Sequence, residues 1–185
     1  MKKAAFLDRD GVINRKAPEG QYVTRWEEMQ FLPGVCEAIH LLNNAGFLVV
    51  VVSNQRCVAK GLITTDELDS MHARMRYEFA AAGATIDAVY YCPHEIQPLC
   101  SCRKPRPGLL LDAARRHNLN LAASWMIGDS ECDVEAGKNA GCHTARLLGD
   151  DKSMDGDADV VASSLLDAAH KILQIDADLP PITVV

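Results

Sequence analysis

The chain has 185 residues, a formal net charge of −6 and 48% hydrophobic residues. This length suits one well-packed domain and is too short for two large ones, so we expect a single domain over residues 1–185. The acidic balance disfavours nucleic acid and anionic membranes as partners. No apolar run reaches about eighteen residues and no cleavable apolar stretch follows Met1, so we expect a cytoplasmic protein. We also expect a monomer.

The first informative feature is a pair of carboxylates directly after an apolar run. Residues 3–7 predict a buried strand, and Asp8 and Asp10 follow it. In an open α/β sheet, ligands bind beyond the carboxyl ends of the strands, so both carboxylates should face a substrate. A metal cation bound by Asp8 would relieve their repulsion and leave Asp10 free for proton transfer. The alternative is a strand that ends in a solvated Asp-Gly turn.

Two later segments carry groups that suit a phosphate. A second apolar run, residues 48–52, ends in Ser53 and Asn54. A hydroxyl at a strand end, followed by turning backbone, donates a hydrogen bond to a phosphate oxygen. Further along the chain, Arg103 and Lys104 offer cations to the same phosphate.

A further apolar run ends in another acidic residue, Asp129, and Asp133 follows four residues later. Carboxylates at such a position suit a divalent metal ion. We expect Asp133 to orient Lys104 or a metal-bound water rather than to bind the metal itself. The sequence therefore predicts a metal site beside a phosphate site.

The alternation of helical and strand patterns predicts the fold class. Thr64 and Glu67 form a capping-box pattern for a helix that runs to about Ala82. The order of elements predicts an α/β protein with a doubly wound parallel sheet. No segment between the motifs is long enough for a large cap domain, so the site should be open. The other strands are expected at residues 86–91, 124–129, 143–148 and 159–162, the other helices at 34–46, 108–117, 133–140 and 165–173, and a surface tail at 176–185.

The segment of residues 92–102 predicts a structural zinc site. Its three thiols and one imidazole meet the tetrahedral preference of Zn²⁺, and four protein ligands leave no open position for water. Such an ion would stiffen the loop that carries Arg103 and Lys104. A chance cluster or a disulfide is the alternative, which the odd total of seven cysteines disfavours. The four expected ligands are Cys92, His94, Cys100 and Cys102.

The motifs stand in an order and at a spacing that resemble those of the haloacid dehalogenase (HAD) superfamily of phosphohydrolases, over about residues 3–148. The run CPHEIQPLCSCRKP, residues 92–105, is similar to the zinc loop of the heptose-1,7-bisphosphate 7-phosphatases and the related histidinol-phosphate phosphatases. This resemblance implies a HAD-like Rossmannoid fold and a Mg²⁺-dependent phosphatase that removes the 7-phosphate of D-glycero-D-manno-heptose 1,7-bisphosphate, on the way to a nucleotide-activated heptose. Histidinol-phosphate phosphatase is the alternative enzyme, and a non-catalytic sugar-phosphate-binding protein is the alternative of another class.

The resemblance also implies a role for each site residue. Asp8 would form an aspartyl-phosphate, while Asp10 would protonate the leaving oxygen and then activate water. Asp8, Asp129 and the backbone carbonyl of Asp10 would bind Mg²⁺. Among the basic residues, the planar fork of Arg103 suits the sugar or a second phosphate. The groups expected to contact phosphate or substrate are Ser53, Asn54, Arg103 and Lys104.

The chain departs from the family pattern just after Asn54. Arg56 is expected to add a cation near the substrate, and Cys57 lacks the conformational freedom of the glycine that is typical there. Among six histidines only His94 has metal spacing, so the others are expected at the surface or as capping groups. These departures leave the catalytic residues intact and leave the identity and anomer of the substrate open.

Overall fold

The computed structural model describes residues 1–97, 99–148 and 157–178. In this part of the chain, parallel strands form one six-stranded sheet in the order β3-β2-β1-β4-β5-β6. The chain runs from β1 outward to one edge and returns to the far side of β1, which confirms the predicted doubly wound sheet. The strands are β1 (Lys3–Leu7), β2 (Phe47–Asn54), β3 (Ala88–Cys92), β4 (Trp125–Gly128), β5 (His143–Leu147) and β6 (Val160–Ala162).

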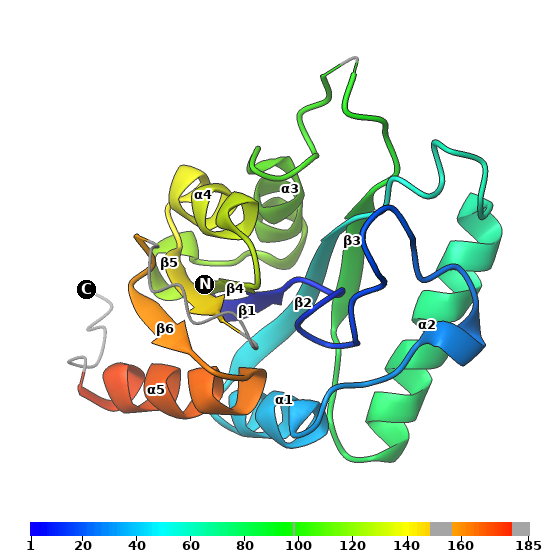
Figure 1. Ribbon diagram of the computed structural model, residues 1–185. Coiled ribbons are helices and arrows are strands. Elements are labelled where there is room, and N and C mark those ends of the chain that lie inside the picture. The colour runs from blue at the N-terminus through cyan, green and yellow to red at the C-terminus, as the bar shows by residue number, and fades with distance from the viewer. Residues whose placement is uncertain (98, 149–156, 179–185) are drawn as a thin grey trace.

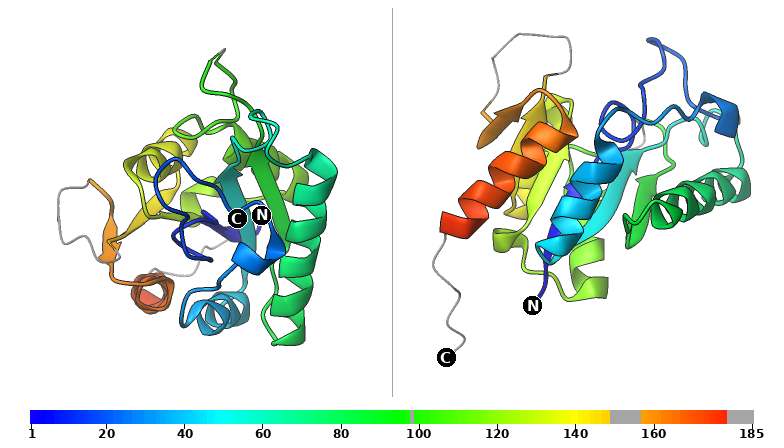
Figure 2. Two further views of the ribbon diagram at one scale, coloured as in Figure 1. Left: turned by 45° about the vertical axis from the view of Figure 1, so that its right-hand side comes forward. Right: turned by 90° about the horizontal axis from the view of Figure 1, so that it is seen from below.

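Helices cover both faces of the sheet (Figures 1 and 2). The pair α1 and α5 packs on one face and the pair α3 and α4 on the other, while α2 lies beside the β3 edge. Short 3₁₀ turns, η1 (Trp26–Glu28) and η2 (Leu121–Ala123), lie in the connections. The helices are α1 (Val35–Asn44), α2 (Thr65–Ala81), α3 (Gly108–His117), α4 (Glu131–Ala140) and α5 (Leu165–Asp178).

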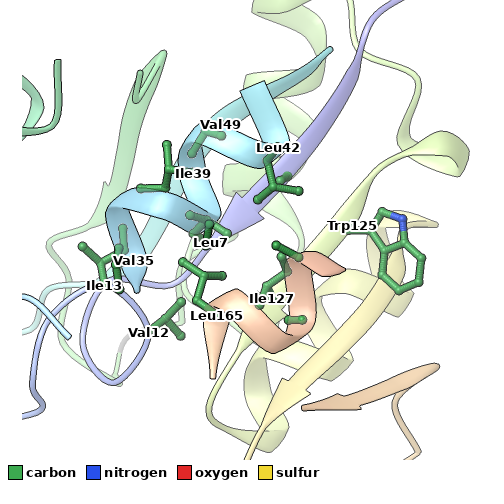
Figure 3. Packing of buried hydrophobic residues seen from close by; sticks show 14 of the residues in the cluster. Leu7, Val12, Ile13, Val35, Ile39, Leu42, Val49, Trp125, Ile127 and Leu165 are labelled. Atoms are coloured by element: carbon green, nitrogen blue, oxygen red, sulfur yellow. The ribbon is translucent and has the colours of Figure 1, made fainter. Parts of the chain in front are cut away.

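The central strand β1 is buried on both sides, which explains its unbroken apolar run. Ala5 and Leu7 face the core beneath α1 and α5, whereas Ala4 and Phe6 face the core beneath α3 and α4. Figure 3 shows Leu7 packed among side chains from α1, α5 and β4. With its sides in two cores, β1 holds the residue that follows it, Asp8, in a fixed position.

Hydrogen bonds explain where the helices begin. Thr64 is the N-cap of α2, its hydroxyl accepting from the Glu67 N–H at 3.2 Å, as the capping-box pattern predicts. The helix α4 begins two residues earlier than predicted, because Ser130 is its N-cap. Asp133, the expected first residue of α4, is instead in the first turn and accepts from the Ser130 N–H at 3.1 Å.

The end of α5 differs from the prediction. The helix continues to Asp178, so residues 176–178 are helical rather than part of a surface tail. An ion pair between Lys3 Nζ and Asp176 Oδ2 at 2.7 Å ties this last turn to β1. The rest of the expected tail, residues 179–185, lies outside the described residues.

The connection between β1 and α1 contains only loops and η1, in agreement with the prediction that there is no large cap domain. The loop that follows β3 projects away from the sheet at its carboxyl edge (Figure 1). None of the helices in the described ranges is long and apolar enough to cross a membrane.

Candidate active site

Loops after β1, β2 and β4 meet the segment before α3 around a cavity of about 400 Å³. These three strands are parallel neighbours, so their carboxyl ends lie at the same edge of the sheet. The strand order changes direction at β1, with β2 on one side of it and β4 on the other. The loop of residues 16–23 also lines this cavity. The residues predicted for catalysis, phosphate binding and Mg²⁺ all line it, namely Asp8, Asp10, Ser53, Asn54, Arg103, Lys104, Asp129 and Asp133.

The ammonium group of Lys104 is buried between two carboxylates. Its Nζ lies 2.9 Å from Asp8 Oδ1 and 2.6 Å from Asp133 Oδ1, and it donates to the Val52 carbonyl at 2.8 Å. Burial alone would lower the pKa of Lys104, but Asp8 and Asp133 outweigh it and raise the pKa. The structure thus places a charged lysine against Asp8.

Asp10 accepts hydrogen bonds on both carboxylate oxygens. Arg9 Nη2 lies 3.0 Å from Oδ1 and 2.9 Å from Oδ2. Asn14 Nδ2 donates to Oδ1 and Gln55 Nε2 donates to Oδ2, each at 2.9 Å. Burial alone would raise the pKa of Asp10, but Arg9 and the two amides outweigh it and hold the pKa below its ordinary value. In this conformation these contacts favour the carboxylate form of Asp10.

Three carboxylates form a site that suits a divalent cation. Asp8, Asp129 and Asp133 each place one oxygen within 4.8 Å of the others. Asp129 Oδ1 is buried without a hydrogen-bond partner among the described residues, while its Oδ2 lies 2.9 Å from Lys16 Nζ. Burial raises the pKa of Asp8 to about 6, and the charge of Asp133 adds to this effect. The site is rich in negative charge, and its hard carboxylate oxygens fit Mg²⁺.

Two glycines permit the close approach of these acidic groups. Gly11 has a φ of +95°, and a Cβ there would lie 2.3 Å from Asp129 Oδ2. A Cβ on Gly128 would lie 2.1 Å from the Cβ of Asp133. A side chain at either position would displace a carboxylate, so both positions require glycine.

The end of β2 is joined to the Lys104 segment. Asn54 Nδ2 donates to the Lys104 carbonyl at 3.1 Å, and Asn54 Oδ1 accepts from the Lys104 N–H at 3.0 Å. The Ser53 hydroxyl lines the cavity and accepts from Gln55 Nε2 at 2.8 Å. Both polar ends of Asn54 therefore hold Lys104 in place, and a contact of Ser53 or Asn54 with phosphate stays a prediction.

The predicted zinc ligands lie together in the loop after β3. The sulfur atoms of Cys92 and Cys102 are 3.5 and 3.4 Å from that of Cys100, and His94 Nδ1 is 3.2 Å from the Cys102 sulfur. Tetrahedral bonds of about 2.0–2.3 Å to zinc separate neighbouring ligand atoms by roughly 3.5–3.8 Å. All seven cysteines are free thiols, and the four donors fit Zn²⁺ in both chemistry and spacing.

Two arginines near this loop have different surroundings. Arg103 lines the cavity, and its Nη1 lies 3.4 Å from the His94 carbonyl. Arg56 is not among the residues that line the cavity, and its guanidinium forms an ion pair with Glu95 in the loop after β3. This ion pair ties the turn after β2 to that loop, and a role of Arg56 near the substrate stays a prediction.

Sequence reasoning missed several residues of the site. Arg9 is fully buried and its guanidinium contacts Asp10, although no motif marks it as part of the site. His72 was expected at the surface or as a cap, but it is 3% exposed and its Nε2 lies 3.1 Å from Arg9 Nη1. A signal was available, because His72 is a polar residue on the apolar stripe of a helix. Gln55 and Lys16 had no such signal, since their roles depend on how loops fold back.

The fold is that of a HAD-like hydrolase. A family model for HAD-like hydrolases, Hydrolase_like, matches residues 101–168. Two relatives are named D-glycero-beta-D-manno-heptose-1,7-bisphosphate 7-phosphatase. The relative from Rhodopseudomonas palustris is 41% identical over 81% of this chain and 86% of its own length. The relative from Pasteurella multocida is 36% identical over 97% of this chain and 96% of its own length.

A solved structure is similar as well. The D,D-heptose 1,7-bisphosphate phosphatase from B. bronchiseptica, complexed with magnesium and phosphate, superposes with a TM-score of 0.85 at 35% identity. The match covers 94% of this chain and 99% of that one. The chain therefore belongs to the family of the D-glycero-D-manno-heptose-1,7-bisphosphate 7-phosphatases.

Proposed function

We propose that the protein is a phosphatase that hydrolyses the 7-phosphate of D-glycero-D-manno-heptose 1,7-bisphosphate, in the biosynthesis of a nucleotide-activated heptose. The observation that carries the proposal is the set of polar groups around one cavity, in a chain that matches relatives of this name over nearly its whole length. A binding protein needs neither a nucleophile nor an acid. We further propose a single-domain cytoplasmic monomer that acts on a small phosphorylated sugar, without nucleic acid or membrane. The polar groups around the cavity that carry the proposal are Asp8, Asp10, Ser53, Lys104 and Asp129.

In the proposed reaction, Asp8 attacks the phosphorus atom and displaces the sugar oxygen, giving an aspartyl-phosphate. Asp10, once protonated, supplies the proton to that leaving oxygen. Water then attacks the phosphorus of the aspartyl-phosphate while Asp10 takes up its proton, which releases inorganic phosphate, restores the Asp8 carboxylate and leaves Asp10 protonated for the next turnover. Lys104, 2.9 Å from Asp8 Oδ1, supplies a positive charge to the transferring phosphoryl group throughout.

Asp8, Asp129 and the backbone carbonyl of Asp10 would hold Mg²⁺ in this site. At an effective dielectric constant near 20, a carboxylate repels each negative charge at 4 Å by about 4 kcal/mol. A bound dication offsets this repulsion between Asp8 and the phosphate. Asp133 has its Oδ2 engaged with Ser130 and its Oδ1 with Lys104, so its part is to position the lysine.

The zinc ligands would have a structural task. Cys92, His94, Cys100 and Cys102 would bind Zn²⁺ and leave no position open for water. Arg103 directly follows the last ligand and lines the cavity, so a rigid loop would fix its guanidinium at the substrate. We assign Arg103 to the sugar or to the phosphate that is not removed.

The experiment that tests the proposal measures phosphate release from the two anomers of heptose 1,7-bisphosphate, histidinol phosphate and fructose 1,6-bisphosphate. We expect the highest kcat/KM on a heptose bisphosphate, and none with Asp8→Asn. A preference for histidinol phosphate would overturn the substrate while keeping the phosphatase chemistry. Substrate binding without turnover in the presence of Mg²⁺ would leave only the non-catalytic alternative.

A further inference from the structure

Arg9 is an unusual residue to find at the centre of a protein. Arg9 is completely buried, although it stands between Asp8 and Asp10 in the chain and lies at the cavity. Its Nη2 reaches both oxygens of Asp10, and its Nε lies 3.2 Å from Asp10 Oδ1. A guanidinium that contacts a carboxylate along one side fixes both the position and the plane of that carboxylate.

The other side of the Arg9 guanidinium contacts a histidine of α2. Arg9 Nη1 lies 3.1 Å from His72 Nε2. Because arginine can only donate, His72 Nε2 must accept, and the imidazole proton resides on Nδ1. His72 Nδ1 is itself buried and has no hydrogen-bond partner among the described residues.

An unpartnered nitrogen in an apolar stripe costs folding free energy, so stability alone does not explain His72. Its neighbours on the same stripe, Leu68 and Met75, are fully buried apolar residues. His72 makes a ring contact with Tyr91, at 5.4 Å between centroids, and its polar contact among the described residues is the one to Arg9. Removing this acceptor would leave a buried N–H of Arg9 without its partner and would release the guanidinium from its present plane.

We propose that His72 is a positioning residue, which acts through Arg9 to hold the Asp10 carboxylate in the orientation from which it exchanges a proton with the leaving oxygen. The inference rests on the proposed function, in which Asp10 is the acid and the base. Asn14 and Gln55 also contact Asp10, but each reaches only one oxygen. Arg9 is the group that spans both oxygens, and His72 holds its far side.

The test compares two substitutions that differ in hydrogen bonding. His72→Met fills similar space without an acceptor for Arg9, whereas His72→Gln offers an amide oxygen near the position of Nε2. The substrates are heptose 1,7-bisphosphate, whose sugar oxygen needs a proton to leave, and p-nitrophenyl phosphate, whose phenolate leaves without one. The ratio kcat/KM reports the steps up to the aspartyl-phosphate.

We expect His72→Met to lose about 10-fold in kcat/KM on the heptose bisphosphate and less than about twofold on p-nitrophenyl phosphate, since one hydrogen bond to a charged group is lost. His72→Gln should recover most of this loss. Met75→Ala serves as a control for altered packing in α2, and it should change both substrates alike. If His72→Met does not fold, His72→Asn takes its place, because its shorter amide cannot reach Arg9.

Equal losses on the two substrates for the His72 variant would overturn the inference, as would a failure of His72→Gln to recover activity. Asp10→Asn in the same assay distinguishes a failure of the inference about His72 from a failure of the proposed function. A strong substrate dependence for Asp10→Asn but not for His72→Met would reject only the role of His72. Near-normal activity of Asp10→Asn on the heptose bisphosphate would reject the acid and base role itself.

Discussion

Lys104 and Asp133 form an ion pair that is almost completely withdrawn from water. The atoms Nζ and Oδ1 are 2.6 Å apart, and both side chains are 1% exposed. The second oxygen of Asp133 caps the start of α4 at Ser130, while Lys104 Nζ also faces Asp8. One carboxylate therefore joins the beginning of a helix to the cation beside the proposed nucleophile.

Asp133→Ala should lower the free energy of unfolding by roughly 2–4 kcal/mol, the sum for one charged hydrogen bond and one helix cap. The loss should stay below that for an isolated buried charge, because Asp8 still faces Lys104. Urea unfolding measures it. Asp112→Ala is the matched control, since its partner Arg115 is exposed on α3 and such pairs contribute about 0–1 kcal/mol. Equal effects of the two variants would contradict this account.

Asp8→Asn should abolish turnover and leave the fold intact, because an amide cannot attack phosphorus and β1 stays packed on both sides. Acid quenching of wild-type protein with radiolabelled substrate should trap label on the chain, and the Asp8→Asn variant should trap none. Circular dichroism checks that the variant is folded. Trapping of label on the folded variant would point to another nucleophile.

The zinc loop gives a prediction about composition and stability. About one equivalent of zinc should copurify with reduced protein. Cys100→Ser should lose the metal, and its main effect should be a lower melting temperature, with a smaller effect on the rate of phosphoryl transfer to Asp8. Cys36→Ser is the control, because Cys36 lies on α1 and donates to the Ala82 carbonyl. Elemental analysis that finds no zinc in the fresh protein would remove this site.

Much of the site follows from residues that are neighbours in the chain. The acidic pair at Asp8 and Asp10, and the hydroxyl of Ser53, each come directly after an apolar run, and strand ends meet at one edge of a parallel sheet. The order of motifs was thus enough to place Lys104 and Asp129 in the same cavity. The capping box at Thr64 was equally local, and it was confirmed.

The features that could not be predicted from the sequence depend on contacts between segments that are distant in the chain. The orientation of Arg56 toward Glu95 results from how the zinc loop folds over the turn after β2. His72 and Arg9 are far apart in the chain, and only the packing of α2 brings them together. The last turn of α5 likewise forms an ion pair with Lys3, at the other end of the chain. No periodic pattern encodes such pairings.

His72 should make stability depend on pH below neutrality. Burial, together with the charge of Arg9, lowers the pKa of His72 from an ordinary 6.5 to about 3. The unfolded chain therefore takes up a proton as pH falls below 6.5 while the folded protein does not, so the free energy of unfolding decreases. Between pH 7 and pH 5, wild type should lose about 2 kcal/mol more than His72→Gln. Parallel pH curves for the two proteins would show that His72 is not held neutral.

Arg103 and Lys104 are adjacent, yet their substitutions should have different consequences. Arg103 lines the cavity and is only partly buried, whereas Lys104 is buried against Asp8. If Arg103 binds the part of the substrate that is not removed, Arg103→Ala should lose roughly 10- to 100-fold more in kcat/KM on heptose 1,7-bisphosphate than on p-nitrophenyl phosphate, which lacks that part. Lys104→Ala should lower both alike, since the transferring phosphoryl group is common to both. Equal losses on the two substrates for Arg103→Ala would mean that the guanidinium has a structural role in the loop after β3. They would also weaken the assignment of a heptose bisphosphate as the substrate.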